Sequence, residues 1–188
     1  MKSEILIKIN NFIKNRLIEL LGFLLVFISI FILASIVSYS PSDPNFIYSP
    51  ENVQIKNVGG FYGSVISDFF LQSLGLVSFF LVFNFLFWGI ALIRDKIINN
   101  FTSKIFYIIV YLIFGTTALS VIYNPSFWLI DNGNGGFVGQ TIKENIFYFT
   151  PLIENQYVIY TFILLAVIFF ILSLSVKINE ISKILFSP

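Results

Sequence analysis

Few side chains in this sequence could do chemistry. Cys and His are both absent, which excludes disulfides, Cys/His metal sites, a thiol nucleophile and an imidazole base. The nearest approach to a ligand pattern is Asp131-Asn132-Gly133-Asn134-Gly135, which begins like a calcium loop. The third, fifth and twelfth positions of that loop should supply oxygen ligands, but here they are Gly133, Gly135 and Ile142. We therefore predict a Gly/Asn turn and no metal-ligating residue.

The glycine-rich segments do not form a nucleotide site. The sequence holds no Gly-x4-Gly-Lys-Ser/Thr motif, and neither glycine-rich segment lies between a predicted strand and a helix. We expect no catalytic residue, no cofactor-binding residue and no enzymatic activity in this chain.

Asn84 is the most notable polar residue within the apolar part of the sequence. In a transporter it would be a substrate or ion ligand. As a packing residue it would form an interhelical hydrogen bond, worth about 0.6 kcal/mol. Because no ionisable residue lies at the centre of an apolar stretch, an internal proton or ion relay is not expected, and the packing interpretation is favoured.

Four long stretches carry no charged residue: 20–39, 69–93, 105–123 and 157–176. About 20 apolar residues in a helix cross the hydrocarbon core of a bilayer. With 57% hydrophobic and 11% charged residues, the chain could not cover a water-soluble surface with polar groups. The sequence therefore predicts an all-α integral membrane protein with four transmembrane helices.

The basic residues predict the orientation of these helices. Nine of the eleven Lys and Arg residues lie in segment 1–19, in link 94–104 and in the tail, whereas loops 40–68 and 124–156 hold only Lys56 and Lys143. By the positive-inside rule, both termini are cytoplasmic and the two loops periplasmic.

The remaining segments have weaker patterns. Residues 1–16 have helical apolar spacing and a basic face, which predicts a cytoplasmic amphipathic lead-in helix, followed by a four-helix anchor domain over 17–188. Each periplasmic loop contains Asn, then Gly-Gly-x-x-Gly, then a short amphipathic stretch that predicts a helix. This similarity indicates duplication of a two-helix unit.

The loop motifs resemble those of the FtsK/SpoIIIE family of DNA translocases. The segment Tyr39-Ser40-Pro41-Ser42-Asp43-Pro44 is similar to the family's SYSPxDPS, and 57–68 resembles its N-x-G-G-x-x-G-x-x-x-S-D. Gly75 matches the Gly of an FG pair, and 135–139 resembles GGxxG. The structural residues that the resemblance indicates are Pro41, Asp43, Pro44, Gly59, Gly60, Gly63, Asp68, Gly75, Gly135, Gly136 and Gly139.

The resemblance implies a function. In this family a four-span domain anchors the protein at the division septum of the bacterial inner membrane and contacts membrane lipid and other division proteins. A linker and a hexameric ATPase follow, and this motor pumps DNA during chromosome segregation. Only the anchor is expected in these 188 residues. ATP, Mg and DNA are implied for the absent motor alone, and a homo-oligomer, possibly a hexamer, is implied through it.

Two other functions stay open. The chain could be a free-standing four-helix membrane protein, such as a small transporter or channel subunit. It could also be a complete, motorless division scaffold. The reading frame beyond Pro188 distinguishes these from an anchor, since only the anchor is followed by a linker and a nucleotide-binding motif.

Overall fold

The computed structural model describes residues 2–48, 54–122, 129 and 132–176, and within these ranges every regular element is helical. The elements in chain order are α1 (Lys2–Val37), α2 (Gly60–Leu74), η1 (Gly75–Val77), α3 (Ser78–Asp95), α4 (Phe101–Ile122), α5 (Gly136–Phe149), η2 (Pro151–Glu154) and α6 (Gln156–Ser173). The two η elements are single 3₁₀ turns.

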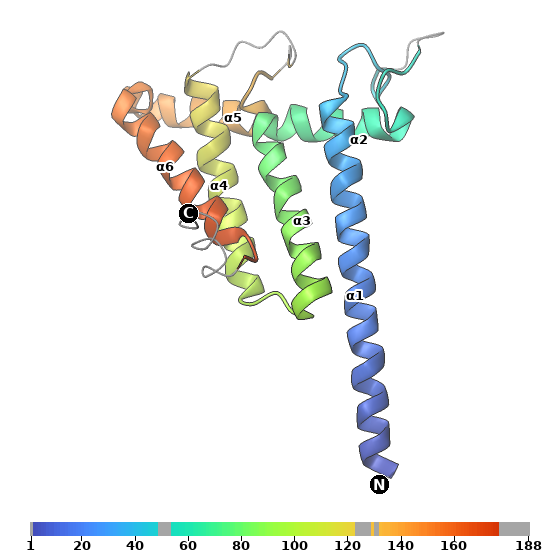
Figure 1. Cartoon of the computed structure of the whole chain (residues 1–188). Helices are drawn as coiled ribbons and strands as arrows, with labels where there is room; N and C mark the ends of the chain where they lie inside the picture. Colours follow the sequence, from blue (N-terminus) through green and yellow to red (C-terminus); the bar gives the residue numbers. More distant parts are fainter. Residues whose placement is uncertain (1, 49–53, 123–128, 130–131, 177–188) are drawn as a thin grey trace, which may run out of the picture.

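Four of these helices run side by side, and α2 and α5 lie across one end of them (Figure 1). We call this the loop end, and the opposite end, where residues 96–100 join α3 to α4, the link end. The described chain contains four helical stretches that are long and apolar enough to cross a membrane. The predicted all-α fold with four membrane-spanning helices is therefore confirmed.

The long helices associate in two pairs, α1 along α3 and α4 along α6. Small residues allow α1 and α3 to approach closely. A Cβ atom added to Gly22 would lie 2.8 Å from the carbonyl oxygen of Gly89, and one added to Gly89 would lie 2.8 Å from that of Gly22. About two turns away on each helix, toward the loop end, the Ser29 hydroxyl donates a 2.9 Å hydrogen bond to the carbonyl of Val82. This is the small-residue packing typical of membrane helices.

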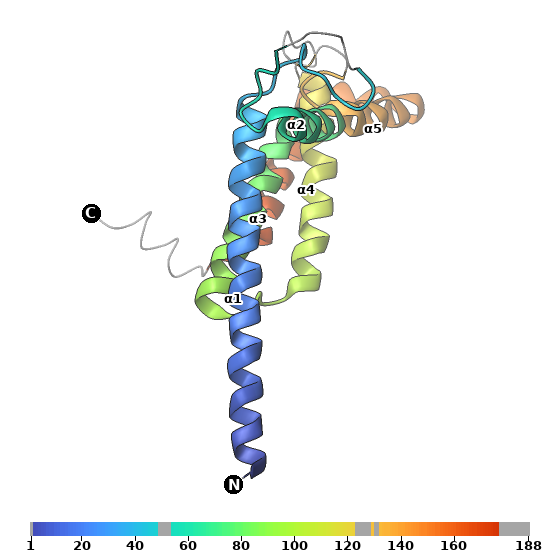
Figure 2. The ribbon, with the colours of Figure 1, turned by 90° about the vertical axis from the view of Figure 1, so that its right-hand side faces the viewer.

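The two halves of the chain repeat one arrangement. In each half a long helix is followed by a crossing helix and then by the long helix that packs on the first, giving α1–α2–α3 and α4–α5–α6. Both crossing helices lie at the loop end, as Figure 2 shows. This is what a duplication predicts, although the repeated unit is a helix pair joined by a crossing helix.

The second span begins later than the sequence predicts. A single helix was expected over 69–93, but α2 ends at Leu74 and α3 begins at Ser78. Gly75 between them has φ = 58°, a left-handed conformation that interrupts the helix. Residues 69–74 therefore belong to the crossing helix. The last span also ends early, at Ser173, because Leu174 is extended.

Helix α1 runs without a break through residue 16, so the lead-in segment and the first span form one helix of 36 residues. At 1.5 Å per residue it is about 54 Å long. Its N-terminal part extends beyond the link end of the other helices (Figures 1 and 2).

The main core lies at the loop end, where the end of α1 meets α2 and α3. Its buried members are Ile32, Ile36, Tyr39, Leu71, Val82 and Leu129. Leu129 comes from the second loop, so this core holds parts of both halves together.

Candidate functional site

The first loop is organised around the buried carboxylate of Asp43. After α1 ends, the chain turns through Pro41 and Pro44, which cannot continue a helix. The Asp43 carboxylate is 3% exposed and accepts hydrogen bonds from the backbone N–H groups of Lys56 at 3.0 Å and Asn57 at 2.8 Å. The carbonyl of Pro44 accepts a 2.8 Å hydrogen bond from the Ser64 hydroxyl of α2. Asp43 thus ties the beginning of the loop to its end, just before α2, and Pro44 ties the loop to α2 itself.

Asn57 continues this network toward α1. Its side-chain amide donates to the carbonyl of Ser35 at 2.8 Å and to the hydroxyl of Ser67 at 3.2 Å. Its side-chain oxygen accepts the backbone N–H of Gly59 at 2.9 Å. Because Asn57 is buried, these bonds satisfy groups that water does not reach, and they fix the start of α2 against α1.

The first Gly-Gly-x-x-Gly motif allows the start of α2 to lie against α1. A Cβ atom on Gly59 or on Gly63 would come within 2.9 Å of the Ser35 hydroxyl. Gly60 has φ = 62° and needs glycine for its backbone conformation alone, since no atom lies within 4 Å of an added Cβ.

The second motif performs the same task between α5 and α4. A Cβ atom on Gly135 would lie 1.9 Å from the Ser120 hydroxyl, and one on Gly139 would lie 2.2 Å from the carbonyl of Thr116. Gly136 has φ = 67°, close to the value for Gly60 at the matching position. The two motifs are therefore alike in geometry as well as in sequence.

At Gly75 the backbones of the two halves touch. A Cβ atom there would lie 2.0 Å from the carbonyl oxygen of Asn134, and the N–H of Leu76 donates a 2.9 Å hydrogen bond to that oxygen. Gly136 lies on the other side of the contact, because a Cβ atom on it would be 2.5 Å from the nitrogen of Gly75.

A chain of side-chain hydrogen bonds also connects the two halves. The Asp68 carboxylate accepts from the Tyr39 hydroxyl at 3.1 Å and from the Asn45 amide at 2.9 Å. Gln72 donates to the Tyr39 hydroxyl at 3.2 Å and accepts from the Asn132 amide at 2.9 Å. Asn132 belongs to the calcium-like segment, whose Asp131 lies outside the described residues, so this segment contributes to the contact between the halves.

Asn84 lies inside the bundle, away from the loop motifs, and connects three helices. Its amide donates to the Ser173 hydroxyl of α6 at 2.7 Å, and its oxygen accepts from the Tyr111 hydroxyl of α4 at 2.6 Å. Nearby, the Trp88 indole donates to the carbonyl of Ser173 at 2.9 Å. Asn84 and Tyr111 are both fully buried, so Asn84 has the partners that the packing interpretation requires.

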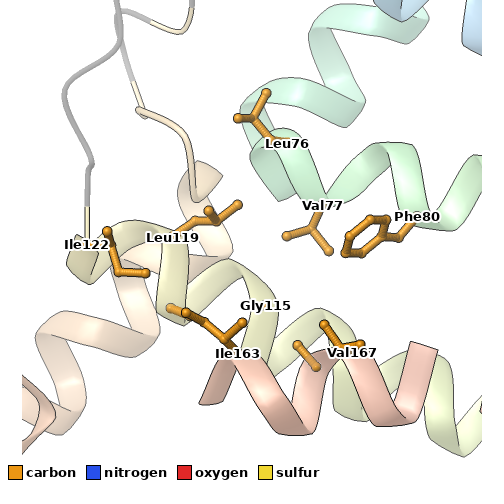
Figure 3. A pocket seen from close by; sticks show the side chains of 10 residues that line it. Leu76, Val77, Phe80, Gly115, Leu119, Ile122, Ile163 and Val167 are labelled. Carbon is orange, nitrogen blue, oxygen red and sulfur yellow. The ribbon is translucent and has the colours of Figure 1, made fainter. Parts of the chain in front are cut away.

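An apolar cavity of about 320 Å³ lies between the two helix pairs, near the loop end. Figure 3 shows the side chains that line it, among them Val77 and Phe80 from one half and Ile163 and Val167 from the other. All the lining residues are apolar or glycine. A water molecule needs two to four polar partners, so this cavity suits hydrocarbon and not a polar solute.

The described residues form no group of three or more His, Cys, Asp or Glu side chains that could hold a metal ion. The loop-end hydrogen bonds described above position α2 and α5, and those around Asn84 join helices. These hydrogen bonds can hold the loop end of the bundle in a fixed shape, and they serve structure and not a reaction.

Comparison with known proteins identifies the family. The model of the 4TM region of DNA translocase FtsK/SpoIIIE matches residues 14–183. A DNA translocase FtsK from Rickettsia bellii is 28% identical over 179 residues, covering 94% of this chain and 23% of the relative. Another from Rhizobium meliloti is 28% identical over 134 residues, covering 71% of this chain and 15% of the relative. A third, from Agrobacterium fabrum, is 27% identical over 131 residues, with coverages of 70% and 15%.

No solved structure matches this chain. The chain spans less than a quarter of the length of these relatives. The family model covers most of the chain, and the four long apolar helices agree with its description. The protein therefore belongs to the FtsK/SpoIIIE family of DNA translocases, of which these residues form the four-transmembrane region.

Proposed function

We propose that this domain is the membrane anchor that holds a cytoplasmic DNA-pumping ATPase at the division septum of the bacterial inner membrane. The observation that carries the proposal is the family match over a four-span helical domain whose described polar groups are used to position helices. ATP, Mg and DNA would be bound by the motor of the complete translocase. The anchor would contribute by keeping the motor at the septum and raising its local concentration there.

The orientation in this proposal has both termini and the link end in the cytoplasm and the loop end in the periplasm. The distribution of Lys and Arg supports it, with nine of eleven on the cytoplasmic side. In this orientation α2 and α5 lie along the periplasmic surface of the membrane. Exposed aromatic residues at this level support an interfacial position, because Tyr and Trp favour the headgroup region; they include Tyr62, Tyr148, Tyr157 and Tyr160.

Contacts with other division proteins are assigned to the loop end. Phe46 and Ile47 protrude from the first loop, and Ile47 is 98% exposed. The hydrogen bonds of Asp43 to Lys56 and of Asn45 to Asp68 fix the described part of this loop beside Phe46 and Ile47, as a recognition surface requires.

A small transporter or channel subunit is the second candidate function. It would need polar groups converging on a pathway at mid-bilayer. Asn84 is engaged by Tyr111 and Ser173, and the cavity between the helix pairs is apolar. These observations favour the anchor.

Fluorescent fusions test the proposal. The domain joined to a fluorescent protein should concentrate at division sites, whereas an unrelated four-span domain with the same label should spread over the envelope. A reporter enzyme that is active only outside the cytoplasm should be active when it is inserted beside Asp43 or Gly136. A reporter that is active only in the cytoplasm should be inactive there. A cytoplasmic signal at either site would refute the orientation, and an even membrane signal would refute septal anchoring.

A further inference from the structure

Helix α1 has a second apolar face, opposite the one that packs on α3. The α3 side is marked by Gly22 and Ser29, which are buried. Two residues along an α-helix correspond to about 200° of rotation. Leu20 and Leu24 flank Gly22 at that spacing, as Phe27 and Phe31 flank Ser29. These four residues therefore point away from α3. Leu20, Leu24 and Phe27 are exposed, whereas Phe31 is half-buried, with its ring against Gly59 at the start of α2.

The apolar residues of this face follow a heptad repeat. Alternating steps of four and three residues connect seven positions, which we call the α1 seam: Leu6, Asn10, Ile13, Leu17, Leu20, Leu24 and Phe27. The seam contains no charged residue and continues for three heptads. A repeat of this length and period is typical of a helix that pairs with another helix along a coiled-coil interface.

The seam extends beyond the part of α1 that a bilayer can cover. About 20 of the 36 residues suffice to cross the hydrocarbon core. Arg16 and Glu19 lie near the link end, where Glu19 forms a 2.6 Å ion pair with Lys96 of the α3–α4 link. Leu6 and Ile13 lie beyond this level and are 67% and 51% exposed. An apolar stripe outside the hydrocarbon needs a partner to cover it.

We propose that the partner is a second copy of this chain, whose α1 packs in parallel along the α1 seam from the membrane interior to the N-terminal extension. Copies inserted in one membrane have the same orientation, so the pairing is parallel. The proposal goes beyond the anchor function, because the pairing needs neither the motor nor the septum.

Two features favour a second copy over the membrane surface as the occupant. The seam keeps its 3.5-residue period across the level of Glu19, and α1 is one uninterrupted helix there. A helix lying on lipid would instead bend at that level. Asn10 also occupies a core position of the repeat, where a polar residue can fix the register of paired helices.

Single cysteines test the pairing directly, because the natural sequence contains none. The 188-residue chain is expressed in bacterial membranes with one residue changed at a time, and the isolated membranes are oxidised. The seam variants are Leu6→Cys, Ile13→Cys and Leu20→Cys. The control Phe12→Cys is adjacent to Ile13 and similarly exposed, but lies off the seam.

The seam variants should give at least about fivefold more disulfide dimer than the control, because a disulfide requires Cβ atoms about 3.5–4.5 Å apart. Equal dimer at Phe12 and at the seam positions would overturn the proposal. No dimer at any position, with the cysteines at Leu6 and Ile13 shielded from a water-soluble maleimide, would show that the face lies on lipid instead.

A second pair of variants tests whether the seam residues themselves carry the pairing. With Leu20→Cys as the reporter, adding Ile13→Lys should lower the dimer yield by at least about fivefold, because a charge in a helix–helix core opposes pairing. Adding Phe12→Lys should leave the yield unchanged. Similar yields from the two lysine variants would contradict pairing through the α1 seam.

Discussion

Replacing Asn84 with Leu tests whether the polar cluster in the bundle serves packing. The change keeps a side chain of similar size but removes both hydrogen bonds of Asn84. Ser173 keeps its bond to the carbonyl of Phe170, whereas the buried Tyr111 hydroxyl loses the one acceptor found for it among the described residues.

The cost follows from these two losses. A hydrogen bond between membrane helices is worth about 0.6 kcal/mol on average. Leaving a buried hydroxyl without a partner costs about 1–3 kcal/mol. We expect Asn84→Leu to lower the free energy of unfolding by about 1–3 kcal/mol, because the second term dominates.

Unfolding of the purified domain in mixed detergent micelles, titrated with a denaturing detergent, measures this change. The double variant Asn84→Leu with Tyr111→Phe removes both polar partners, so it should be more stable than Asn84→Leu alone. Phe83→Leu, at a partly exposed neighbouring position, is the control for a change in α3 that touches no polar group. A double variant as unstable as the sum of the single changes would refute the reasoning. Loss of solute flux at unchanged stability would instead support a ligand role for Asn84.

Three further changes are predicted with the same unfolding assay. Gly75→Ala should lower stability by clearly more than about 1–2 kcal/mol, because its φ of 58° and ψ of −145° suit glycine alone and its Cβ would lie 2.0 Å from a backbone oxygen of the other half. The matched control Gly60→Ala has a similar φ of 62° and open space, so it should show the strain alone, and equal losses at both positions would contradict the contact. Asp43→Ala should cost about 1–3 kcal/mol, since it leaves two backbone N–H groups without their acceptor, and a neutral result would argue against its role in ordering the loop. Glu19→Gln should change stability little, because its ion pairs with Lys96 and Arg16 lie at the water-accessible link end, and a loss as large as that of Asp43→Ala would contradict this.

The second span shows where the sequence was insufficient. The apolar stretch 69–93 reads as one helix, because Phe69–Leu74 carry no charge and four of these six residues are Phe or Leu. The chain breaks at Gly75 because that residue accepts a left-handed conformation and must lie against Asn134, 59 positions later. Hydropathy reports which residues avoid water, and it does not report the direction in which a helix runs.

Several packing residues were also missed. The loop motifs pointed to their glycines, but no motif pointed to Gly22 and Gly89, although a Cβ atom added to either would lie 2.8 Å from the carbonyl oxygen of the other. The only sequence pattern that indicates this packing face is weak: Gly22 and Ser29 are small residues one heptad apart on α1. Which small residue faces which helix depends on the pairing of α1 with α3, and this cannot be read from either helix alone.

The sequence by itself determined that the chain is a four-span helical membrane protein, because the cost of placing a charge in hydrocarbon confines Lys, Arg, Asp and Glu to the segments between spans. The sequence also contains the family's motifs in the expected order and spacing. Only the tertiary structure decided how the spans pair, that each half carries a crossing helix at the loop end, and that Asp68, Tyr39, Gln72 and Asn132 join the halves. These features depend on contacts between residues far apart in the chain, whose side chains have matching shapes and hydrogen-bonding groups only once the helices are packed.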